Sequence, residues 1–139
     1  MDMMSPISKI MTSNVVTLNR RDSLNTAEML FKTHKIRHIP VVDKDILLGM
    51  LSYSDLLRIS FADAVYEDEE TVDTVVYNMF TIEQVMEKKL VSVSSNTTIK
   101  EVASILSKKD FHALPITKNE KLVGIVTTTD LLNYLLKQY

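Results

Sequence analysis

Residues 49–55 read Gly-Met-Leu-Ser-Tyr-Ser-Asp, and residues 124–130 read Gly-Ile-Val-Thr-Thr-Thr-Asp. Each stretch holds a glycine, two apolar residues, a hydroxyl residue, two spacers and an aspartate, and the two stretches lie 75 positions apart. An apolar run that ends in this pattern predicts a strand leading directly into a helix, with the hydroxyl residue at the N-cap and the aspartate at N3. The chain therefore contains two equivalent strand-to-helix junctions.

The same offset of 75 positions places residues 6–57 on residues 81–132 without a gap. Identical pairs include Met11 with Met86 and Pro40 with Pro115, and most other apolar positions of one copy are apolar in the other. Self-similarity at a fixed offset predicts one structural unit that is used twice. The chain is 139 residues long, the size of one ordinary domain, so we expect two repeats that share one core.

Hydrophobic periodicity and capping residues predict the element order α-β-α-β-β-α in each copy. The fold class is thus α/β (α+β), with repeat 1 at residues 1–62, an acidic helical linker at 63–80 and repeat 2 at 81–139. The predicted elements of the first copy are residues 6–11, 15–18, 24–34, 39–42, 46–52 and 53–62; those of the second are 82–86, 91–93, 98–109, 114–117, 121–126 and 128–136.

Bulk composition excludes several classes of function. The net charge is −2 and the pI about 5.9, which disfavours broad binding to nucleic acid or to anionic lipid. No apolar run approaches the ~20 residues that cross a bilayer, and the sequence predicts a cytoplasmic protein. The chain has no cysteine, and it lacks zinc-protease, P-loop and nucleophile-elbow motifs, so we expect no enzyme activity.

Residues 59–87 contain eight acidic residues and no lysine or arginine. The simplest interpretation is a solvated connector that extends the last helix of the first repeat. The alternative is an interaction module in which the acidic segment 63–73 docks a basic partner and any ligand clefts of the repeats are vestigial. Both interpretations stay open at the level of sequence.

The two junctions suit a ligand as well as a helix cap. An ionised carboxylate offers only acceptors, so Asp55 or Asp130 can take the hydroxyl protons of a ribose. The neighbouring hydroxyls of Ser52 and Thr127 can donate or accept. Amides at a helix N-terminus favour an anion such as phosphate. Capping and binding are compatible roles for the same side chains.

The chain resembles a tandem pair of cystathionine-β-synthase (CBS) domains, the Bateman module. The resemblance rests on Arg-His-Ile-Pro-Val-Val-Asp at residues 37–43, on His-Ala-Leu-Pro-Ile at 112–116, and on the window that follows each. It implies two sheet-and-helix repeats related by a pseudo-twofold axis, with two clefts that bind adenosine nucleotides or their derivatives. It also implies a homodimer.

The resemblance assigns roles to residues of both clefts. In one cleft Ser52 and Asp55 would hold the ribose and Arg37 and His38 would line the phosphate side; in the other these roles fall to Thr127, Asp130 and His112. The opening strand of the opposite repeat would flank the adenine, through Lys89 and Val91 in the first cleft and Asn14 and Val16 in the second. Without the resemblance, Arg37, His38 and Lys89 would be interpreted as solvated surface residues.

The two predicted clefts differ in charge. The first combines Arg37, His38 and Lys89, whereas the second has His112 as its main basic group. Arginine grips phosphate through a bidentate fork, which a neutral histidine cannot match. We therefore expect the Asp55 cleft to take the phosphorylated ligand.

The resulting expectation is a regulatory module that binds AMP, ADP, ATP or S-adenosylmethionine and transmits binding to a dimer or to an effector protein. It requires no cofactor, although ATP would bring Mg²⁺. The exposed apolar faces of the late helices would form the dimer contact, which predicts exposure of Leu56, Leu57, Leu131, Leu132 and Leu135.

Overall fold

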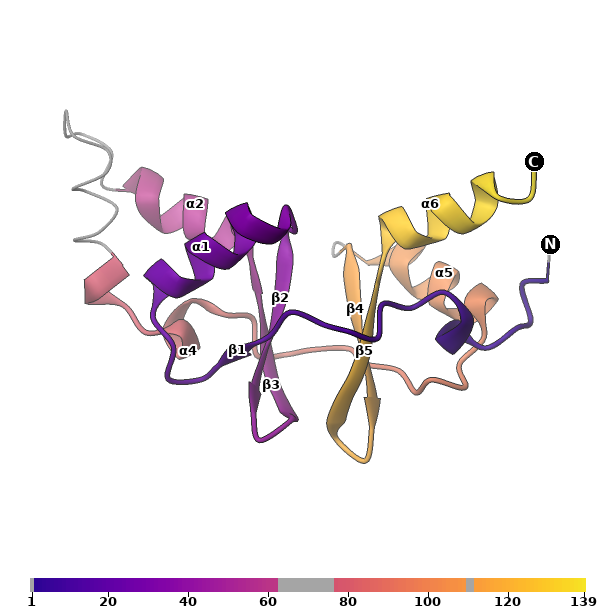
Figure 1. Cartoon of the computed structure of the whole chain (residues 1–139), viewed down its shortest axis with the longest axis horizontal. Helices are drawn as coiled ribbons and strands as arrows, with labels where there is room; N and C mark the ends of the chain where they lie inside the picture. The colour runs from indigo at the N-terminus through magenta and orange to yellow at the C-terminus, as the bar shows by residue number, and fades with distance from the viewer. Residues whose placement is uncertain (1, 63–76, 110–111) are drawn as a thin grey trace. The chain divides into compact units, whose positions relative to one another are not determined.

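The computed structural model describes residues 2–62, 77–109 and 112–139 (Figure 1). Most of the predicted linker 63–80, including the acidic segment 63–73, lies outside the described residues, and residues 77–79 are helical. The chain divides into two compact units. Unit 1 is Met1–Val15 with Val91–Tyr139, and unit 2 is Val16–Leu90.

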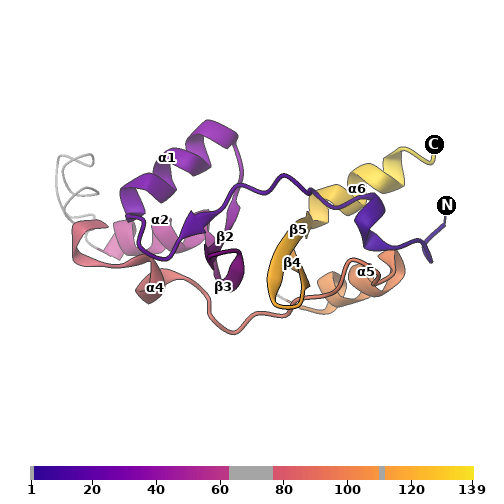
Figure 2. The same ribbon diagram turned by 60° about the horizontal axis from the view of Figure 1, so that its bottom comes forward.

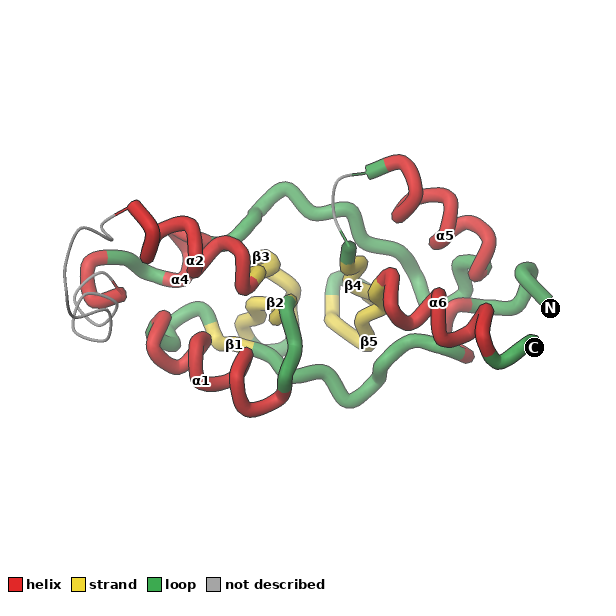
Figure 3. The backbone as a smooth tube through the Cα atoms, turned by 90° about the horizontal axis from the view of Figure 1, so that it is seen from above, coloured by secondary structure: helices red, strands yellow, loops and turns green. Residues whose placement is uncertain are grey.

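Unit 2 contains the body of the first repeat. Its strands β1, β2 and β3 form a sheet in which β1 pairs parallel to β2 and β2 pairs antiparallel to β3. Helices α1 and α2 lie side by side on one face of these strands (Figure 3), and α4 lies beside β3 (Figure 2). The bounds are β1 Leu18–Asn19, α1 Leu24–His34, β2 His38–Asp43, β3 Ile46–Ser52, α2 Tyr53–Ala62 and α4 Ile82–Val85.

Unit 1 contains the body of the second repeat. The antiparallel hairpin β4–β5 carries helices α5 and α6 on one face (Figure 3). A single parallel bridge between Val93 and Ile116 stands where unit 2 pairs Leu18 with Val41. The bounds are the 3₁₀ helix η1 Ile7–Lys9, α5 Ile99–Lys108, β4 Ala113–Lys118, β5 Lys121–Thr127 and α6 Thr128–Leu136.

Both hairpins turn through two residues with positive φ. Lys44 and Asp45 have φ of 50° and 70°, and Asn119 and Glu120 have φ of 52° and 69°. Two left-handed residues in a row are the signature of a type I′ turn, whose twist matches that of the flanking strands. Both hairpins also carry a register shift at the same repeat position, between Val41 and Val42 and between Ile116 and Thr117.

Each unit contains the opening segment of the other repeat: residues 81–90 of repeat 2 belong to unit 2, and residues 2–15 of repeat 1 belong to unit 1. In unit 2, Met50 of β3 exchanges two backbone hydrogen bonds with Glu87 (3.0 and 2.9 Å). In unit 1, Ile125 of β5 exchanges the equivalent bonds with Thr12 (2.9 and 2.8 Å). The sequence repeats at 1–62 and 81–139 therefore do not coincide with the compact units.

A methionine–glycine contact accompanies each of these bridges. A Cβ placed on Gly49 would lie 2.5 Å from the Met86 sulfur, and one on Gly124 would lie 2.6 Å from the Met11 sulfur. These are the only two glycines of the chain, and neither has a positive φ. The close approach of the opening segment, rather than a turn, explains why each position is glycine.

The hydrophobic cores are consistent with this exchange. Ile82 and Met86 of the second repeat's opening segment are buried in the core of unit 2, against residues such as Leu51. Ile7 of the first repeat's opening segment is buried in the core of unit 1, against residues such as Val126. Each core is thus completed by side chains from the other repeat.

The fold class is confirmed, with local corrections. The described side chains form two cores rather than the one shared core that was expected, and the strand expected at residues 91–93 is reduced to the bridge at Val93. The strand expected at residues 15–18 is reduced to Leu18–Asn19, because the chain passes from unit 1 to unit 2 after Val15. Leu56 is fully buried in the core of unit 2, so its expected exposure was wrong, and Leu131 is half-buried and packs against the core of unit 1. Leu57, Leu132 and Leu135 are exposed. Among the described residues, no helix has both the length and the apolar character needed to cross a bilayer.

Candidate functional site

The Asp55 junction in unit 2 is a complete reciprocal cap. The Ser52 backbone N–H donates to Asp55 Oδ2 (3.0 Å), and the Asp55 backbone N–H donates to Ser52 Oγ (3.1 Å). These two bonds satisfy amides that the first turn of α2 would otherwise leave without partners. The carboxylate is consequently held in one orientation at the point where β3 becomes α2.

Arg37 and His38 lie at the same junction. The first amide of α2, that of Tyr53, donates to the Arg37 carbonyl (2.9 Å). His38 lies directly opposite Ser52 in the β2–β3 register. The Arg37 side chain is exposed and that of His38 is half-buried. The hairpin therefore brings four of the predicted site residues, Arg37, His38, Ser52 and Asp55, to one end of unit 2.

Lys89 lies in the same unit but is less closely tied to the junction. It follows Glu87, and its backbone N–H donates to the Glu87 carboxylate (3.1 Å). Because Glu87 pairs antiparallel to Met50, the chain after Glu87 runs away from the end of β3 where α2 begins. Val91, predicted for the same cleft, falls just beyond the boundary in unit 1, where it is exposed.

The Asp130 junction in unit 1 repeats the geometry of the Asp55 junction. The Thr127 N–H donates to Asp130 Oδ2 (2.9 Å), and the Asp130 N–H donates to Thr127 Oγ1 (3.1 Å). The first amide of α6, that of Thr128, donates to the His112 carbonyl (2.9 Å). His112 is exposed, and Asn14 is an exposed residue of the same unit. Val16 lies just beyond the boundary, in unit 2.

The second oxygen of each aspartate distinguishes the two junctions. Asp55 Oδ1 accepts a bond from Arg58 Nη1 at 3.3 Å, and the two side chains form an ion pair. Position 58 corresponds to Asn133 in the second repeat. Within the described part of the chain, Asp130 Oδ1 accepts no hydrogen bond. Among the residues that the structure describes, a cation pairs with the carboxylate of Asp55 and none with that of Asp130.

Three further residues at the junctions, one pair and one single residue, were missed by the sequence analysis. Ser54 and Thr129 are exposed hydroxyl residues that directly precede the two aspartates, and the hydroxyl in both copies was the available signal. Arg58 was missed as well, although its position one helical turn after Asp55 is a recognisable ion-pair spacing. These side chains extend the polar surface around each carboxylate.

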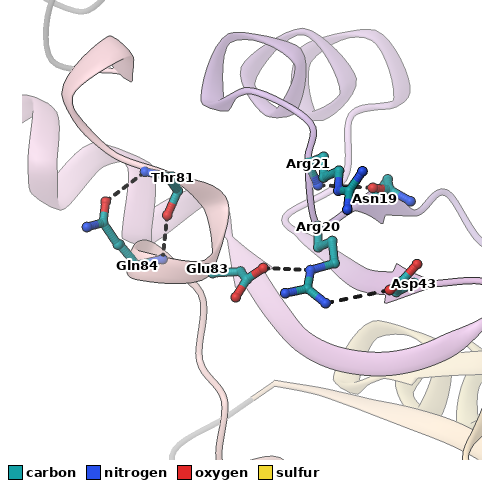
Figure 4. Close-up of polar contacts among 7 residues, drawn as sticks. All are labelled: Asn19, Arg20, Arg21, Asp43, Thr81, Glu83 and Gln84. Atoms are coloured by element: carbon teal, nitrogen blue, oxygen red, sulfur yellow. Dashed lines mark hydrogen bonds and ion pairs between the residues drawn. The ribbon is translucent and has the colours of Figure 1, made fainter.

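An ion-pair cluster in unit 2 fastens the segment that leads to Lys89. Arg20 Nε donates to Glu83 Oε1 of α4 at 2.8 Å, and Arg20 Nη1 lies 3.6 Å from Asp43 Oδ2 at the end of β2 (Figure 4). The hydrogen bond to Glu83 raises the pKa of Arg20, and Asp43 adds to the shift. Thr81 and Gln84 close a capping box on α4 in the same view. Repeat 2 has Ser95 at the position of Arg20.

No group of three or more histidine, aspartate or glutamate side chains in the described ranges could hold a metal ion. The polar groups at both junctions are hydrogen-bond acceptors, hydroxyl groups and, in unit 2, guanidinium groups. Such a set can recognise a ligand that carries hydroxyls and, in unit 2, negative charge.

Comparison with known proteins agrees with the repeat and with the fold. The family model described as "CBS domain" matches residues 7–62 and again residues 82–137. The CBS domain-containing protein YhcV of Bacillus subtilis is 30% identical over 128 residues, which cover 92% of this chain and 84% of that protein.

Solved structures show the same likeness. The structure of a putative acetoin utilization protein, AcuB, from Vibrio cholerae has a TM-score of 0.81 and 29% identity, covering 97% of this chain and 93% of that one. The structure of CBSX2 in complex with AMP has a TM-score of 0.79 and 21% identity, covering 96% and 98%. With two matches of the family model that together span most of the sequence, the chain belongs to the CBS-domain family and contains a pair of CBS domains.

Proposed function

We propose that this chain is a regulatory module that binds adenosine nucleotides or derivatives at its two strand-to-helix junctions. The main support for this proposal is that one carboxylate oxygen of Asp55, and one of Asp130, accepts a hydrogen bond from a backbone N–H, which fixes the carboxylate. The carboxylate retains lone pairs for further donors, and the two hydroxyls of a ribose are donors of that kind. The similarity to a CBS pair solved with AMP supports a ligand that contains adenosine.

The two sites differ in the ligand charge that they favour. The Asp55 site carries Arg37 and Arg58 at the junction. Lys89 lies on the part of the opening segment that runs away from this junction, so it is the weaker candidate of the three cations. The Asp130 site carries His112, whose imidazole lacks the permanent charge and the bidentate donor geometry of arginine. AMP, ADP or ATP would therefore favour the Asp55 site, and S-adenosylmethionine, which carries no phosphate, is the better candidate for the Asp130 site.

Binding would be transmitted to a second copy of the chain or to an effector protein. Helix α6 exposes Leu132, Leu135 and Leu136 at 54%, 41% and 68%. An apolar helix face of this kind suits association, and we include a homodimer in the proposal. The proposed role is regulation by binding: a ligand that binds one of two states more tightly shifts the equilibrium towards that state.

Isothermal titration of AMP, ADP, ATP and S-adenosylmethionine tests the proposal, with light scattering on the same samples to measure the mass. Asp55→Asn should weaken AMP binding about tenfold or more, because the amide presents an N–H₂ where the ribose needs an acceptor. The same change leaves one carbonyl oxygen that can still accept from the Ser52 N–H.

The matched control removes the cap without touching the carboxylate. Ser52→Ala and Thr127→Ala each delete an N-cap hydroxyl, which costs about 1 kcal/mol of stability. They should lower the melting temperature more than Asp55→Asn does, while weakening AMP binding less. No heat from any of the four ligands would refute ligand binding, and a monomer mass at micromolar concentration would refute the homodimer.

A further inference from the structure

We propose that Arg58 sets the charge preference of the Asp55 site, so that it discriminates phosphorylated adenosine ligands from uncharged ones. This inference rests on the proposed function of that site. Arg58 is one helical turn after Asp55 on α2, and its Nη1 lies 3.3 Å from Asp55 Oδ1. The oxygen that Arg58 contacts is the one that the Ser52 cap leaves open.

Exposure makes this ion pair exchangeable. The Arg58 side chain is 74% exposed, whereas that of Asp55 is only 16% exposed. A solvated guanidinium on a long side chain can change partners at small cost. Asp55 is different, because two reciprocal bonds with Ser52 hold it in place. The carboxylate is thus the fixed member of the pair and Arg58 the movable one.

Ribose binding changes the electrostatic balance of this pair. A ribose that donates to Asp55 Oδ1 competes with the Arg58 guanidinium for the same lone pairs. An uncharged nucleoside offers Arg58 no anion in exchange, so part of the ion pair is lost without compensation. A phosphate carried on the same ribose offers a new anionic partner, which arginine binds well. Arg58 therefore opposes uncharged ligands and favours phosphorylated ones.

The second repeat provides the natural contrast. Its equivalent residue, Asn133, has no charge, and in the described part of the chain Asp130 Oδ1 accepts no hydrogen bond. A ribose can therefore approach Asp130 without displacing a cation. The same carboxylate geometry is combined with a movable cation in one unit and with none in the other.

The experiment compares AMP with adenosine at one site at a time. In an Asp130→Asn background the remaining heat of titration reports the Asp55 site, and in an Asp55→Asn background it reports the Asp130 site. Arg58→Gln removes the charge and retains a good helix former. We expect it to weaken AMP and to strengthen adenosine, so that the ratio of their dissociation constants changes about fivefold.

The reciprocal change and a matched control complete the design. Asn133→Arg should shift the Asp130 site towards AMP by a similar factor, because it recreates the Asp55 arrangement. Lys32→Gln removes another exposed cation from unit 2, one that pairs with Glu28 on α1. This control should leave the AMP-to-adenosine ratio within about twofold of the parent, because Lys32 pairs on a different helix.

The outcomes separate this inference from the proposed function. A parent protein that binds neither ligand overturns the proposed function, and the role of Arg58 with it. A parent that binds AMP, with an Arg58→Gln ratio unchanged within twofold, overturns only the role of Arg58. Equal strengthening of both ligands by Arg58→Gln also overturns it, since Arg58 would then merely compete with ribose.

Discussion

The two units hold the opening segment of the other repeat through different interactions. In unit 1 the first repeat's opening segment is bound by its main chain: Ile7 N–H donates to Thr97 O (2.7 Å), and Ile99 N–H donates to Ser5 O (2.9 Å). In unit 2 the described main-chain bonds between the opening segment and the repeat body are those of Glu87 with Met50. The rest of that attachment depends on side chains.

The side-chain attachment of unit 2 has a polar and an apolar part. Arg20 pairs with Glu83 of α4, and both side chains are about two-fifths exposed (42% and 38%). Tyr77 is 5% exposed, and its phenol accepts a bond from Ser60 Oγ (3.3 Å). Exposed ion pairs are weakened by salt, whereas main-chain bonds are not screened in this way. The difference implies that unit 2 responds more to solution conditions than unit 1.

The methionine–glycine contact is common to both units and should give the largest effects. An alanine at position 49 would place its Cβ 2.5 Å from Met86 Sδ and 2.9 Å from the Glu87 carbonyl oxygen. An alanine at position 124 would meet Met11 Sδ at 2.6 Å and the Thr12 carbonyl oxygen at 3.1 Å. Overpacking of this kind costs about 1–3 kcal/mol. Urea unfolding should show that Gly49→Ala costs more than Gly124→Ala, because only position 49 meets backbone below 3.0 Å.

Shortening the methionine sharpens this comparison. Met11→Ala combined with Gly124→Ala removes the closest side-chain atoms, so it should cost less than the sum of the single changes. Met86→Ala combined with Gly49→Ala should recover less, because the Glu87 carbonyl remains in place. Equal recovery at both positions would contradict the interpretation that main chain limits position 49.

Much of this arrangement could be predicted from the sequence, because local signals carry it. The offset of 75 residues, the reciprocal caps at Asp55 and Asp130 and the turns after Asp43 and Lys118 are all encoded by neighbouring residues. The charge contrast between Arg37 and His112 is likewise visible without coordinates. The roles of those residues in ligand binding stay predictions.

The exchange of opening segments could not be predicted from the residues alone. Met11 can lie on Gly49 of its own repeat or on Gly124 of the other, and the repeat pattern is the same in both cases. The resemblance to CBS pairs implied the exchange for the residues flanking adenine, but no local signal did so. The prediction that Leu56 is exposed was wrong for a related reason. Leu56 adjoins the exposed Leu57, and only the packing of α2 shows which of the two faces the core.

Removing the Arg20 ion pair should loosen the opening segment of unit 2 and leave that of unit 1 unchanged. Hydrogen exchange provides matched probes, because the Glu87 and Thr12 amides donate equivalent bonds of 2.9 and 2.8 Å. Arg20→Ala should accelerate exchange at Glu87 about twofold to fivefold, as expected for an exposed pair, without changing Thr12. Added salt should likewise accelerate exchange at Glu87 in wild type, and it should change exchange little in Arg20→Ala. Acceleration at both amides would mean global destabilisation instead.

The smallest effect is expected from acid, through Glu28 on α1. Burial raises the pKa of Glu28, but hydrogen bonds from Tyr77 and Lys32 outweigh burial and hold the pKa below its ordinary value of 4.5. A carboxyl whose pKa is lower in the folded state stabilises the fold above its unfolded pKa, and this contribution is lost as pH falls through the folded pKa.

Wild type should therefore lose slightly more stability than Glu28→Gln as the pH falls from above 4.5 through the folded pKa of Glu28, as measured by urea unfolding. The other carboxyl groups titrate in both proteins, so only the difference between the two curves reports Glu28. Because Tyr77 lies just before the exchanged segment in the sequence and contacts both α1 and α2, the loss should accompany faster exchange at Glu87 and leave Thr12 unaffected. If the stability curves of wild type and Glu28→Gln run parallel with pH, the Tyr77–Glu28 contact does not help to hold the opening segment in unit 2.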